Sequence, residues 1–276
     1  MSFPRLPDWL IYLTVVASIC TVAVVRRDAA HAPPAPRPAD AREGDLVGPN
    51  APVDQLSLVQ APSGPLQPVL GTAFATGGQG QWLTARHGVF DCRKAAVLMS
   101  SDLAMPAKIT RLPGGDLALL TTQGGPAGLP LGAVRAPHTG ERAYAPGYPQ
   151  GLPGEVALQY LGTDTVNIRG LGTQTVLAWA EIGRTDELGE QLKGLAGAPV
   201  LDRQGHVLGV MLAARPRRGR IFTTSTQTLA LAAKRLAPAA EQPEAGEPIT
   251  AENYGRIADS LRRDARVAEV RCLVTG

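Results

Sequence analysis

The sequence predicts an all-β protein, either a β-sandwich or a pair of antiparallel β-barrels. From Val53 onward, short apolar runs follow one another and are separated by turn residues, of which the chain has 31 glycines and 24 prolines. No long stretch in the middle of the chain repeats apolar residues with the period of a helix. The 276 residues, of which 44% are hydrophobic, are enough to fill a large core.

The first part of the chain is predicted to be a membrane anchor followed by a spacer. Residues 9–25 carry no charge and are just long enough to cross a bilayer as a helix. The alternatives are a cleaved signal peptide and a buried helix. Pro33 would follow a cut after Ala32, which is unfavourable, and a buried helix is disfavoured at the extreme N-terminus beside a proline-rich stretch. We expect an uncleaved single-span anchor in residues 1–28. In residues 29–52 we expect a linker, because this stretch is rich in Ala, Pro and charge and cannot bury enough surface to fold.

Residues 53–236 are expected to form the main domain. Its predicted strands are apolar runs bounded by Gly, Pro or Asp, at residues 69–76, 81–85, 95–99, 107–112, 117–120, 142–145, 156–161 and 173–178. A β-hairpin is predicted next, because the turn Asp202-Arg203-Gln204-Gly205 lies between two apolar runs. Residues 222–235 begin as a strand and become helical near Gln227.

Residues 237–276 form a tail that is too short to be a domain of its own. It begins with a polar, proline-containing linker. A helix is predicted from Thr250, a plausible N-cap, to about Arg266, and the alternation in residues 267–274 predicts a strand. We expect this tail to pack back on the main domain.

Cysteine usage and charge limit the ligands that we expect. Cys20 lies in the predicted anchor, so Cys92 and Cys272 are the only candidates for a pair; they form a disulfide in an oxidising compartment or remain two buried thiols. Four-ligand zinc spacing is absent, and we expect no metal and no cofactor. A formal net charge of +3 is too small to indicate a nucleic-acid partner. The oligomeric state does not follow from the sequence.

Three segments carry residue types that are suited to acyl-transfer chemistry. His87 directly follows an apolar strand, Asp116 precedes another strand, and a glycine-rich loop runs from Gly194 to Pro199. Each feature alone is more often structural, since an Asp in this setting usually caps a turn. The order His, Asp, glycine loop along the chain is the order that chymotrypsin-like double barrels use.

With these residues the sequence resembles the trypsin-like serine peptidases of the HtrA type. The resemblance covers about residues 70–229 and rests on five motifs, Gly71-Thr72-Ala73-Phe74, Thr84-Ala85-Arg86-His87, Gly115-Asp116-Leu117-Ala118, Gly147-Tyr148-Pro149-Gln150-Gly151 and Gly194-Leu195-Ala196-Gly197-Ala198-Pro199-Val200. It implies two six-stranded antiparallel β-barrels, to which the sequence adds an N-terminal transmembrane helix and a short C-terminal helix. It also implies a polypeptide substrate or peptide ligand. No PDZ-like module follows Leu236.

The resemblance assigns a role to each site residue. His87 would be the general base, and Asp116 would hold its imidazole in the productive tautomer. The backbone N–H groups of Gly194 and Ala196 would form the oxyanion hole. Ala196 occupies the position of the nucleophile, and a methyl group cannot attack a carbonyl, so no acyl-enzyme is expected. Cys92 and Cys272 are poor replacements, because neither is flanked by an oxyanion loop. Ser225 is a poor replacement because it lies in a strand-like Thr-Thr-Ser-Thr run, which we expect to border the substrate cleft.

Two interpretations of Ala196 stay open. In the first, the chain is a serine endopeptidase into which the alanine was introduced; the retention of both His87 and Asp116 favours this. In the second, the alanine is native and the protein is a pseudoprotease that binds peptides or a partner; the departures from the family pattern at Leu195 and Ala198 favour this. Glu190 would favour a basic substrate side chain if it points into the specificity pocket.

The side of the membrane on which the domain lies is predicted from conflicting signals. Arg26 and Arg27 follow the predicted anchor and mildly favour a cytoplasmic C-terminal portion. The candidate disulfide and the family resemblance favour the opposite side. We expect a single-pass protein of the inner membrane with its domain in the periplasm or another extracytoplasmic space.

Overall fold

The computed structural model describes residues 59–60, 71–78, 80–90, 92, 94–100, 103–131, 135–168, 170–185, 192–215, 219–237 and 247–273. All of them belong to one compact unit, Pro33–Gly276. The predicted anchor at residues 9–25 and the linker at residues 29–52 lie outside the described residues. Among the helices that are described, none combines the length and the apolar character needed to cross a bilayer.

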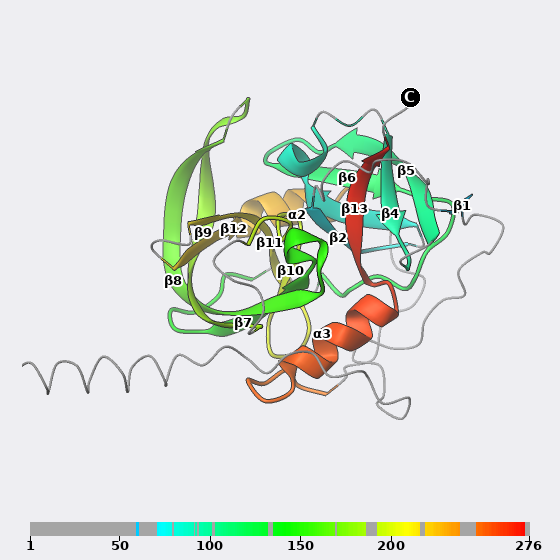
Figure 1. Cartoon of the computed structure of the whole chain (residues 1–276). Coiled ribbons are helices and arrows are strands. Elements are labelled where there is room, and N and C mark those ends of the chain that lie inside the picture. The colour runs from blue at the N-terminus through cyan, green and yellow to red at the C-terminus, as the bar shows by residue number, and fades with distance from the viewer. Residues whose placement is uncertain are drawn as a thin grey trace, which may run out of the picture. The chain divides into compact units, whose positions relative to one another are not determined.

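The described strands form two closed antiparallel β-barrels of six strands each (Figure 1), as predicted. The first barrel has the order β5-β4-β13-β2-β3-β6 and closes through β5 and β6; its strands are β2 (Gly71–Ala75), β3 (Gln81–Ala85), β4 (Lys94–Leu98), β5 (Leu103–Arg111), β6 (Leu117–Thr121) and β13 (Val267–Leu273). A two-residue strand, β1 (Val59–Gln60), pairs with β5. The second barrel has the order β10-β11-β12-β9-β8-β7; its strands are β7 (Arg142–Gly147), β8 (Gly154–Ile168), β9 (Gly172–Arg184), β10 (Pro199–Leu201), β11 (Val207–Arg215) and β12 (Arg220–Thr224). Four short helices are described, η2 (Arg86–Val89), η3 (Pro149–Gly151), α2 (Thr226–Ala233) and α3 (Tyr254–Arg263).

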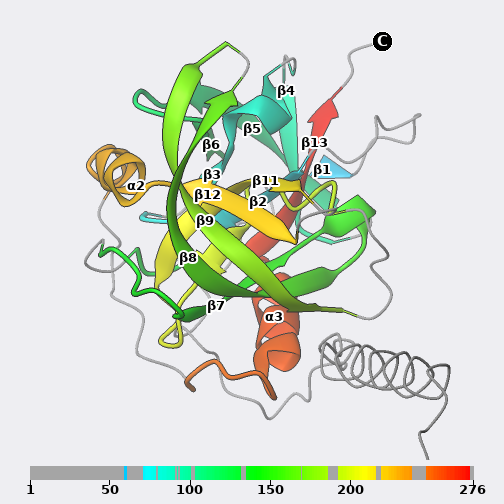
Figure 2. The same cartoon turned by 90° about the vertical axis from the view of Figure 1, so that its left-hand side faces the viewer.

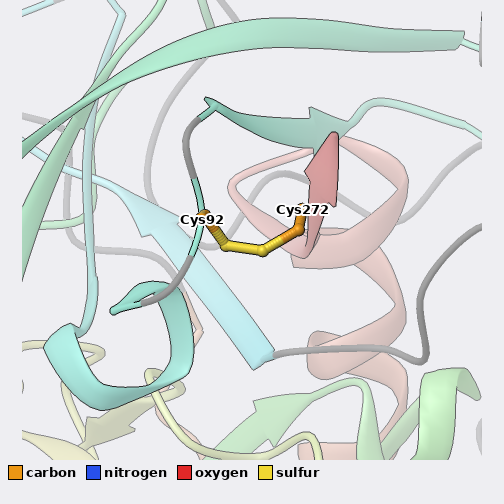
Figure 3. Close-up of a disulfide and its surroundings, with 2 residues drawn as sticks. All are labelled: Cys92 and Cys272. Carbon is orange, nitrogen blue, oxygen red and sulfur yellow. A yellow bond between two sulfur atoms is a disulfide. The ribbon is translucent and has the colours of Figure 1, made fainter. Parts of the chain in front are cut away.

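The C-terminal strand β13 is a full member of the first barrel. It lies between β2 and β4 (Figure 1), pairing Val270 with Gly71 on one side and Cys272 with Ala95 on the other. The strand itself was predicted, whereas its place inside the barrel was not. A disulfide joins Cys272 to Cys92 with 5.2 Å between their Cα atoms (Figure 3), so the alternative of two free thiols is excluded.

The hairpin of β8 and β9 is longer than predicted. The predicted strands ended at residue 161 and began at residue 173, whereas the ladder continues to the pair Ile168 and Gly172. Pairing of β9 with β12 ends at Val176, so the tip of the hairpin extends beyond the barrel (Figure 2). The tip alternates exposed Thr163 and Thr165 with partly buried Val166. Such polar, β-branched residues resemble a loop in composition but suit a strand that is exposed on one face.

The predicted start of the C-terminal helix is wrong by one turn. The helix α3 begins at Tyr254 with Asn253 at the N-cap position. Thr250 instead belongs to a preceding turn, in which its N–H donates to Asn253 Oδ1 at 2.7 Å and its hydroxyl accepts from the Glu252 N–H at 3.2 Å. A threonine hydroxyl satisfies such a turn as well as a helix terminus, which is why the sequence pattern alone misplaced the helix.

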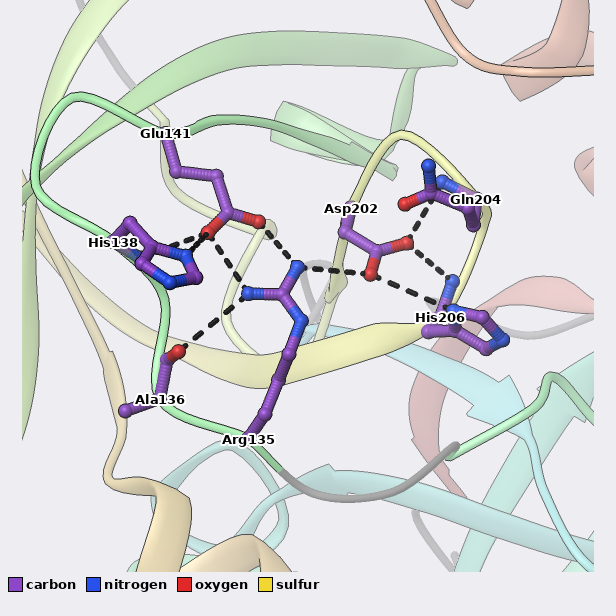
Figure 4. Close-up of polar contacts among 7 residues, drawn as sticks. All are labelled: Arg135, Ala136, His138, Glu141, Asp202, Gln204 and His206. Atoms are coloured by element: carbon purple, nitrogen blue, oxygen red, sulfur yellow. Dashed lines mark hydrogen bonds and ion pairs between the residues drawn. The ribbon is translucent and has the colours of Figure 1, made fainter.

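A polar cluster fixes the connector between the barrels onto the second barrel (Figure 4). The Arg135 guanidinium pairs with the Glu141 carboxylate and, at 3.2 Å, with Asp202 Oδ2. Asp202 is buried, and its Oδ1 accepts the N–H groups of Gln204 and His206 at 2.9 Å each, which shapes the β10–β11 turn. Hydrogen bonding from Arg135 lowers the pKa of Glu141 to about 2.

Candidate active site at the barrel junction

The predicted nucleophile loop is a tight turn between β9 and β10. Gly194 and Gly197 have φ angles of +102° and +92°, which favour glycine. A Cβ at Gly197 would lie 2.0 Å from the Thr72 carbonyl oxygen, so this position also requires glycine for space. The Gly197 N–H donates to the Met211 carbonyl at 2.7 Å and the Ala198 N–H to the Leu195 carbonyl at 2.9 Å.

Two amides of this loop have no acceptor within the described part of the chain. The N–H groups of Gly194 and Ala196 donate no hydrogen bond to any residue that the structure describes. These are the two amides that the sequence analysis predicted as an oxyanion hole. An oxyanion hole needs donors that are free before the reaction and held in place by the surrounding backbone.

Thr72, at the second position of β2, holds this loop from the first barrel, and the sequence analysis gave it no role. Its hydroxyl donates to the Gly194 carbonyl at 2.8 Å and accepts from the Tyr148 N–H at 3.0 Å. Its own N–H donates to the Ala196 carbonyl at 2.9 Å. On the other side of the loop, the Gln150 N–H donates to the Lys193 carbonyl. The strand β2 and the β7–β8 turn therefore fix the peptide plane at Gly194.

His87 and Asp116 form a direct pair at the edge of the first barrel. His87 Nδ1 lies 2.6 Å from Asp116 Oδ2, and the His87 N–H donates to Asp116 Oδ1 at 2.9 Å. The carboxylate is buried at 2% exposure, whereas 44% of the His87 side chain is exposed. A carboxylate acceptor at Nδ1 favours the tautomer with its proton on that nitrogen, which leaves Nε2 as the free base.

The helix α2 supports the turn that carries Asp116, a contribution that the sequence analysis missed. Its Thr228 hydroxyl donates to the Gly114 carbonyl at 3.2 Å. Ser225 accepts from the Thr228 N–H and is the N-cap of α2. Ser225 therefore caps a helix, and Cys92 and Cys272 are joined in a disulfide. None of these three residues is available to replace the nucleophile that is missing at position 196.

The fold brings the predicted site residues to the junction of the two barrels. Ala85, two residues before His87, shares an apolar cluster with Ala196. A Cβ on Gly197 would approach the Ala85 amide nitrogen at 2.9 Å, which shows how closely the loop meets the end of β3. Glu190 lies outside the described residues. Within the described ranges, no cluster of three or more His, Cys, Asp or Glu residues is suited to bind a metal.

The surface beside Ala196 is apolar. Its cluster contains buried Leu212 and Phe222 from β11 and β12, together with buried residues of β9. Val166 and Ile168 reach the same cluster from the projecting part of the β8–β9 hairpin. The side chain at the nucleophile position is therefore surrounded on this side by hydrocarbon.

Two closed barrels with a His–Asp pair on one and a glycine loop on the other define the chymotrypsin-like class of peptidase folds. The family model of the trypsin-like peptidase domain matches residues 71–210, and the chain belongs to this family. No curated protein matches the sequence.

Solved structures of related fold include HtrA-type proteases. The active form of the Rv3671c protease from M. tuberculosis superposes with a TM-score of 0.52 at 19% identity, covering 78% of this chain and all of that one (100%). The HtrA-type protease AlgW with a decapeptide gives a TM-score of 0.50 at 20% identity, covering 70% of this chain and 65% of that one. At these identities the likeness concerns the fold.

Proposed function

We propose that this chain is a membrane-anchored peptidase scaffold that binds extended polypeptide at the barrel junction and, with Ala196 in place, does not cut it. One observation carries the proposal. The His87–Asp116 pair and the loop with two unpaired amides are complete, whereas the position of the nucleophile holds a methyl group. Binding and polarising groups are therefore present, and the attacking atom is missing.

The proposed chemistry follows from the position of each group. With a serine at position 196, His87 Nε2 would take the hydroxyl proton while Asp116 stabilises the imidazolium. The amides of Gly194 and residue 196 would hold the negative oxygen of the tetrahedral intermediate. With alanine, a peptide carbonyl can still occupy the loop, but no bond to the protein can form.

Substituting Ala196→Ser tests the peptidase proposal. We expect the folded variant to react covalently with a fluorophosphonate probe, as detected by in-gel fluorescence, and the unchanged chain to give no signal. The matched control is Ala196→Ser combined with His87→Ala, which should lose the labelling because the base is absent. A folded Ala196→Ser variant that stays unlabelled would contradict a serine-peptidase scaffold.

A native pseudoprotease is the second candidate, and the packing of Ala196 favours it. The methyl group lies in the apolar cluster with Leu212 and Phe222, an environment that suits alanine better than a hydroxyl. We expect the unchanged chain to bind unstructured peptides without cleaving them, as measured by calorimetry and mass spectrometry. A peptide library that gives no heat of binding would argue against this candidate.

The apolar surface favours one class of substrate side chain. A peptide residue that enters beside Ala196 would meet the partly buried members of this cluster, Val166 and Ile168, which pack against the buried residues beneath them. We expect peptides with Leu or Phe at this position to bind more tightly than those with Lys, by about tenfold or more, because a buried ammonium group would lose its hydration. A preference for Lys would instead support a specificity role for Glu190.

The proposed location is the extracytoplasmic face of the inner membrane. The Cys92–Cys272 disulfide supports it, because structural disulfides persist in oxidising compartments. A cysteine placed in the linker at residues 29–52 should react with a membrane-impermeant maleimide in cells whose inner membrane is intact. Labelling that requires lysis of this membrane would place the domain in the cytoplasm.

A further inference from the structure

A groove on the first barrel lies apart from the barrel junction. It has a volume of about 1080 Å³. It is lined by the end of η2, the start of β4, the C-terminal part of β5 from Pro106 to Arg111, and the end of β6. His87, Asp116 and Ala196 do not line it. Its volume is slightly above the range of about 300–1,000 Å³ that is typical of small-molecule pockets, so it has room for a larger ligand.

The floor of the groove has a hydrocarbon part, which borders the polar residues Thr110, Thr121, Thr122 and Gln123. Val89 and Ala107 belong to the interior cluster of the first barrel, and partly buried Ile109 packs against that cluster. The other interior residues include five more alanines, Ala73, Ala75, Ala95, Ala118 and Ala268.

The rim of the groove is cationic and carries an exposed aromatic ring. Phe90 is 48% exposed, and the Arg111 guanidinium lies 4.9 Å from the centre of its ring. Lys94 and Lys108 are exposed on the same rim.

Lys94, Lys108 and Arg111 have no acidic partner within the part of the chain that the structure describes. The neighbouring Asp91 and Arg93 lie outside the described residues, and their formal charges cancel. The rim therefore carries unbalanced positive charge above a partly apolar floor, which is the pattern of a surface that attracts an anionic partner.

We propose that this groove binds an acidic, extended peptide segment of a partner protein. Its carboxylates would lie against Lys94, Lys108 and Arg111, and an apolar side chain of the same segment would rest on the floor beside Phe90. A nucleic acid would present phosphates to the rim but nothing to fill the hydrocarbon part of the floor, so a peptide fits both halves of the groove. The occupant would contact η2, the short helix that also carries His87.

Fluorescence anisotropy with the full chain in detergent tests the proposal. The probe is a fluorescein-labelled decapeptide of alternating Glu and Leu. We expect saturable binding that weakens as salt is added. The same peptide with Gln in place of Glu should bind about tenfold more weakly, because the ion pairs are lost. Equal binding of the two peptides would overturn the proposal.

Matched variants locate the binding on the protein. The double variant Lys94→Glu with Lys108→Glu should weaken binding by about tenfold or more, and Phe90→Ala by about threefold. Lys234→Glu, an exposed charge reversal after α2, should leave the affinity within about twofold. Unchanged binding by the double variant would overturn the proposal, provided that its thermal midpoint matches that of the unchanged chain.

Two further measurements distinguish the acidic peptide from other anionic ligands, and the groove from the site at the barrel junction. Tighter binding of a single-stranded oligonucleotide or of dihexanoyl phosphatidylglycerol than of the acidic peptide, with the same sensitivity to the double variant, would overturn the peptide assignment. In the Ala196→Ser background, the double variant should keep its fluorophosphonate labelling while losing the acidic peptide. These measurements therefore distinguish a failure of the acidic-peptide proposal from a failure of the peptidase proposal.

Discussion

The two barrels have the same number of strands, but the chain supplies them in different ways. The second barrel is continuous in sequence, from Arg142 in β7 to Thr224 in β12. The first barrel takes five strands from residues 71–121 and its sixth from β13 at the far end of the described chain. Closure of the first barrel therefore depends on a non-local pairing, which forms against a larger loss of chain entropy.

The interiors of the two barrels also differ, in the size of the side chains that fill them. Large side chains fill the second barrel, among them Leu158, Leu177, Trp179 and Met211. The first barrel holds six alanines together with Trp82 and a few aliphatic residues. The cluster inside the second barrel therefore buries larger side chains, whereas the first barrel has β13 and the disulfide as additional constraints. Because His87 and Asp116 belong to the first barrel, the His–Asp pair lies on the barrel whose closure depends on the tail.

Deleting β13 should have the largest effect and should separate the two barrels. A chain truncated after Asp264 loses the ladders to both β2 and β4 and leaves two open edges. Hydrogen exchange should show the amides of β2 to β6 exchanging freely while those of β8, β9 and β11 stay protected. A chain truncated after Leu273 keeps β13 and is the control. Protection in β2 to β6 that survives the shorter truncation would show that the first barrel closes without its sixth strand.

The Arg262→Ala substitution tests how the tail is fixed to the second barrel. Arg262 of α3 lies 3.0 Å from Glu155 Oε2, both side chains are buried, and Arg262 also donates to the Gly154 carbonyl. Removing the guanidinium leaves a buried carboxylate without its counter-charge, which should cost about 3–5 kcal/mol in the free energy of unfolding. Chemical denaturation at pH 7 measures this loss. The conservative Arg262→Lys substitution should recover part of it.

The loss of unfolding free energy in the Arg262→Ala variant should depend on pH. Burial raises the pKa of Glu155 above its ordinary value of 4.5, and loss of Arg262 should raise it further. An acid with a raised folded pKa weakens the fold as the pH rises above its unfolded pKa, because the unfolded state then loses its proton more readily. The variant should therefore differ from the unchanged chain more at pH 7 than at pH 4. An equal difference at both values would exclude Glu155 as the source.

Removing the disulfide should have an effect of similar or smaller size that is confined to the first barrel. The cross-link joins residues separated by 180 positions in sequence. The double variant Cys92→Ser with Cys272→Ser should lose about 2–5 kcal/mol of unfolding free energy, because its unfolded chain is less constrained. The Cys20→Ser variant is the control. A reductant should destabilise the unchanged chain equally, and insensitivity to reductant would show that the bond contributes nothing.

The same contrast explains how much of the fold could be predicted from the sequence. Local alternation and turn residues located β3 at residues 81–85 and β6 from Leu117 onward, because their signals lie within a few positions. The strand β13 was visible as alternation, but its neighbours were not, since pairing of Val270 with Gly71 leaves no local trace. The tip of the β8–β9 hairpin was missed because threonines on an exposed face resemble a loop.

Some residues of the candidate site could likewise be predicted from the sequence, and others could not. His87, Asp116 and the Gly194–Ala196 loop were predicted because their order along the chain is distinctive. Thr72 and Thr228 were missed, since each acts by a hydroxyl bond to a backbone carbonyl that lies 122 or 114 residues away. Any threonine has such a hydroxyl, so only the folded arrangement shows which carbonyl it meets.

The smallest expected effect comes from Glu141 and should appear in the second barrel alone. Arg135 holds the pKa of Glu141 at about 2, below its ordinary value of 4.5, so this carboxylate stabilises the fold above pH 4.5 and loses that contribution as the pH falls toward 2. The Glu141→Gln substitution should therefore flatten the fall in thermal midpoint between pH 4.5 and pH 2. The change should be slight because Arg135 is partly exposed.

Each barrel has one buried tryptophan, Trp82 in the first and Trp179 in the second, which allows the Glu141 effect to be assigned to one barrel once the third tryptophan of the chain, Trp9, is replaced by Phe in both backgrounds. In a Trp82→Phe background, the fluorescence of Trp179 should show the flatter acid response of Glu141→Gln. In a Trp179→Phe background, the response of Trp82 should be unchanged by Glu141→Gln. An equal change in the acid response of both tryptophans would mean that the barrels unfold as one cooperative unit. The difference between the barrels would then concern how the chain assembles them, and not their stability.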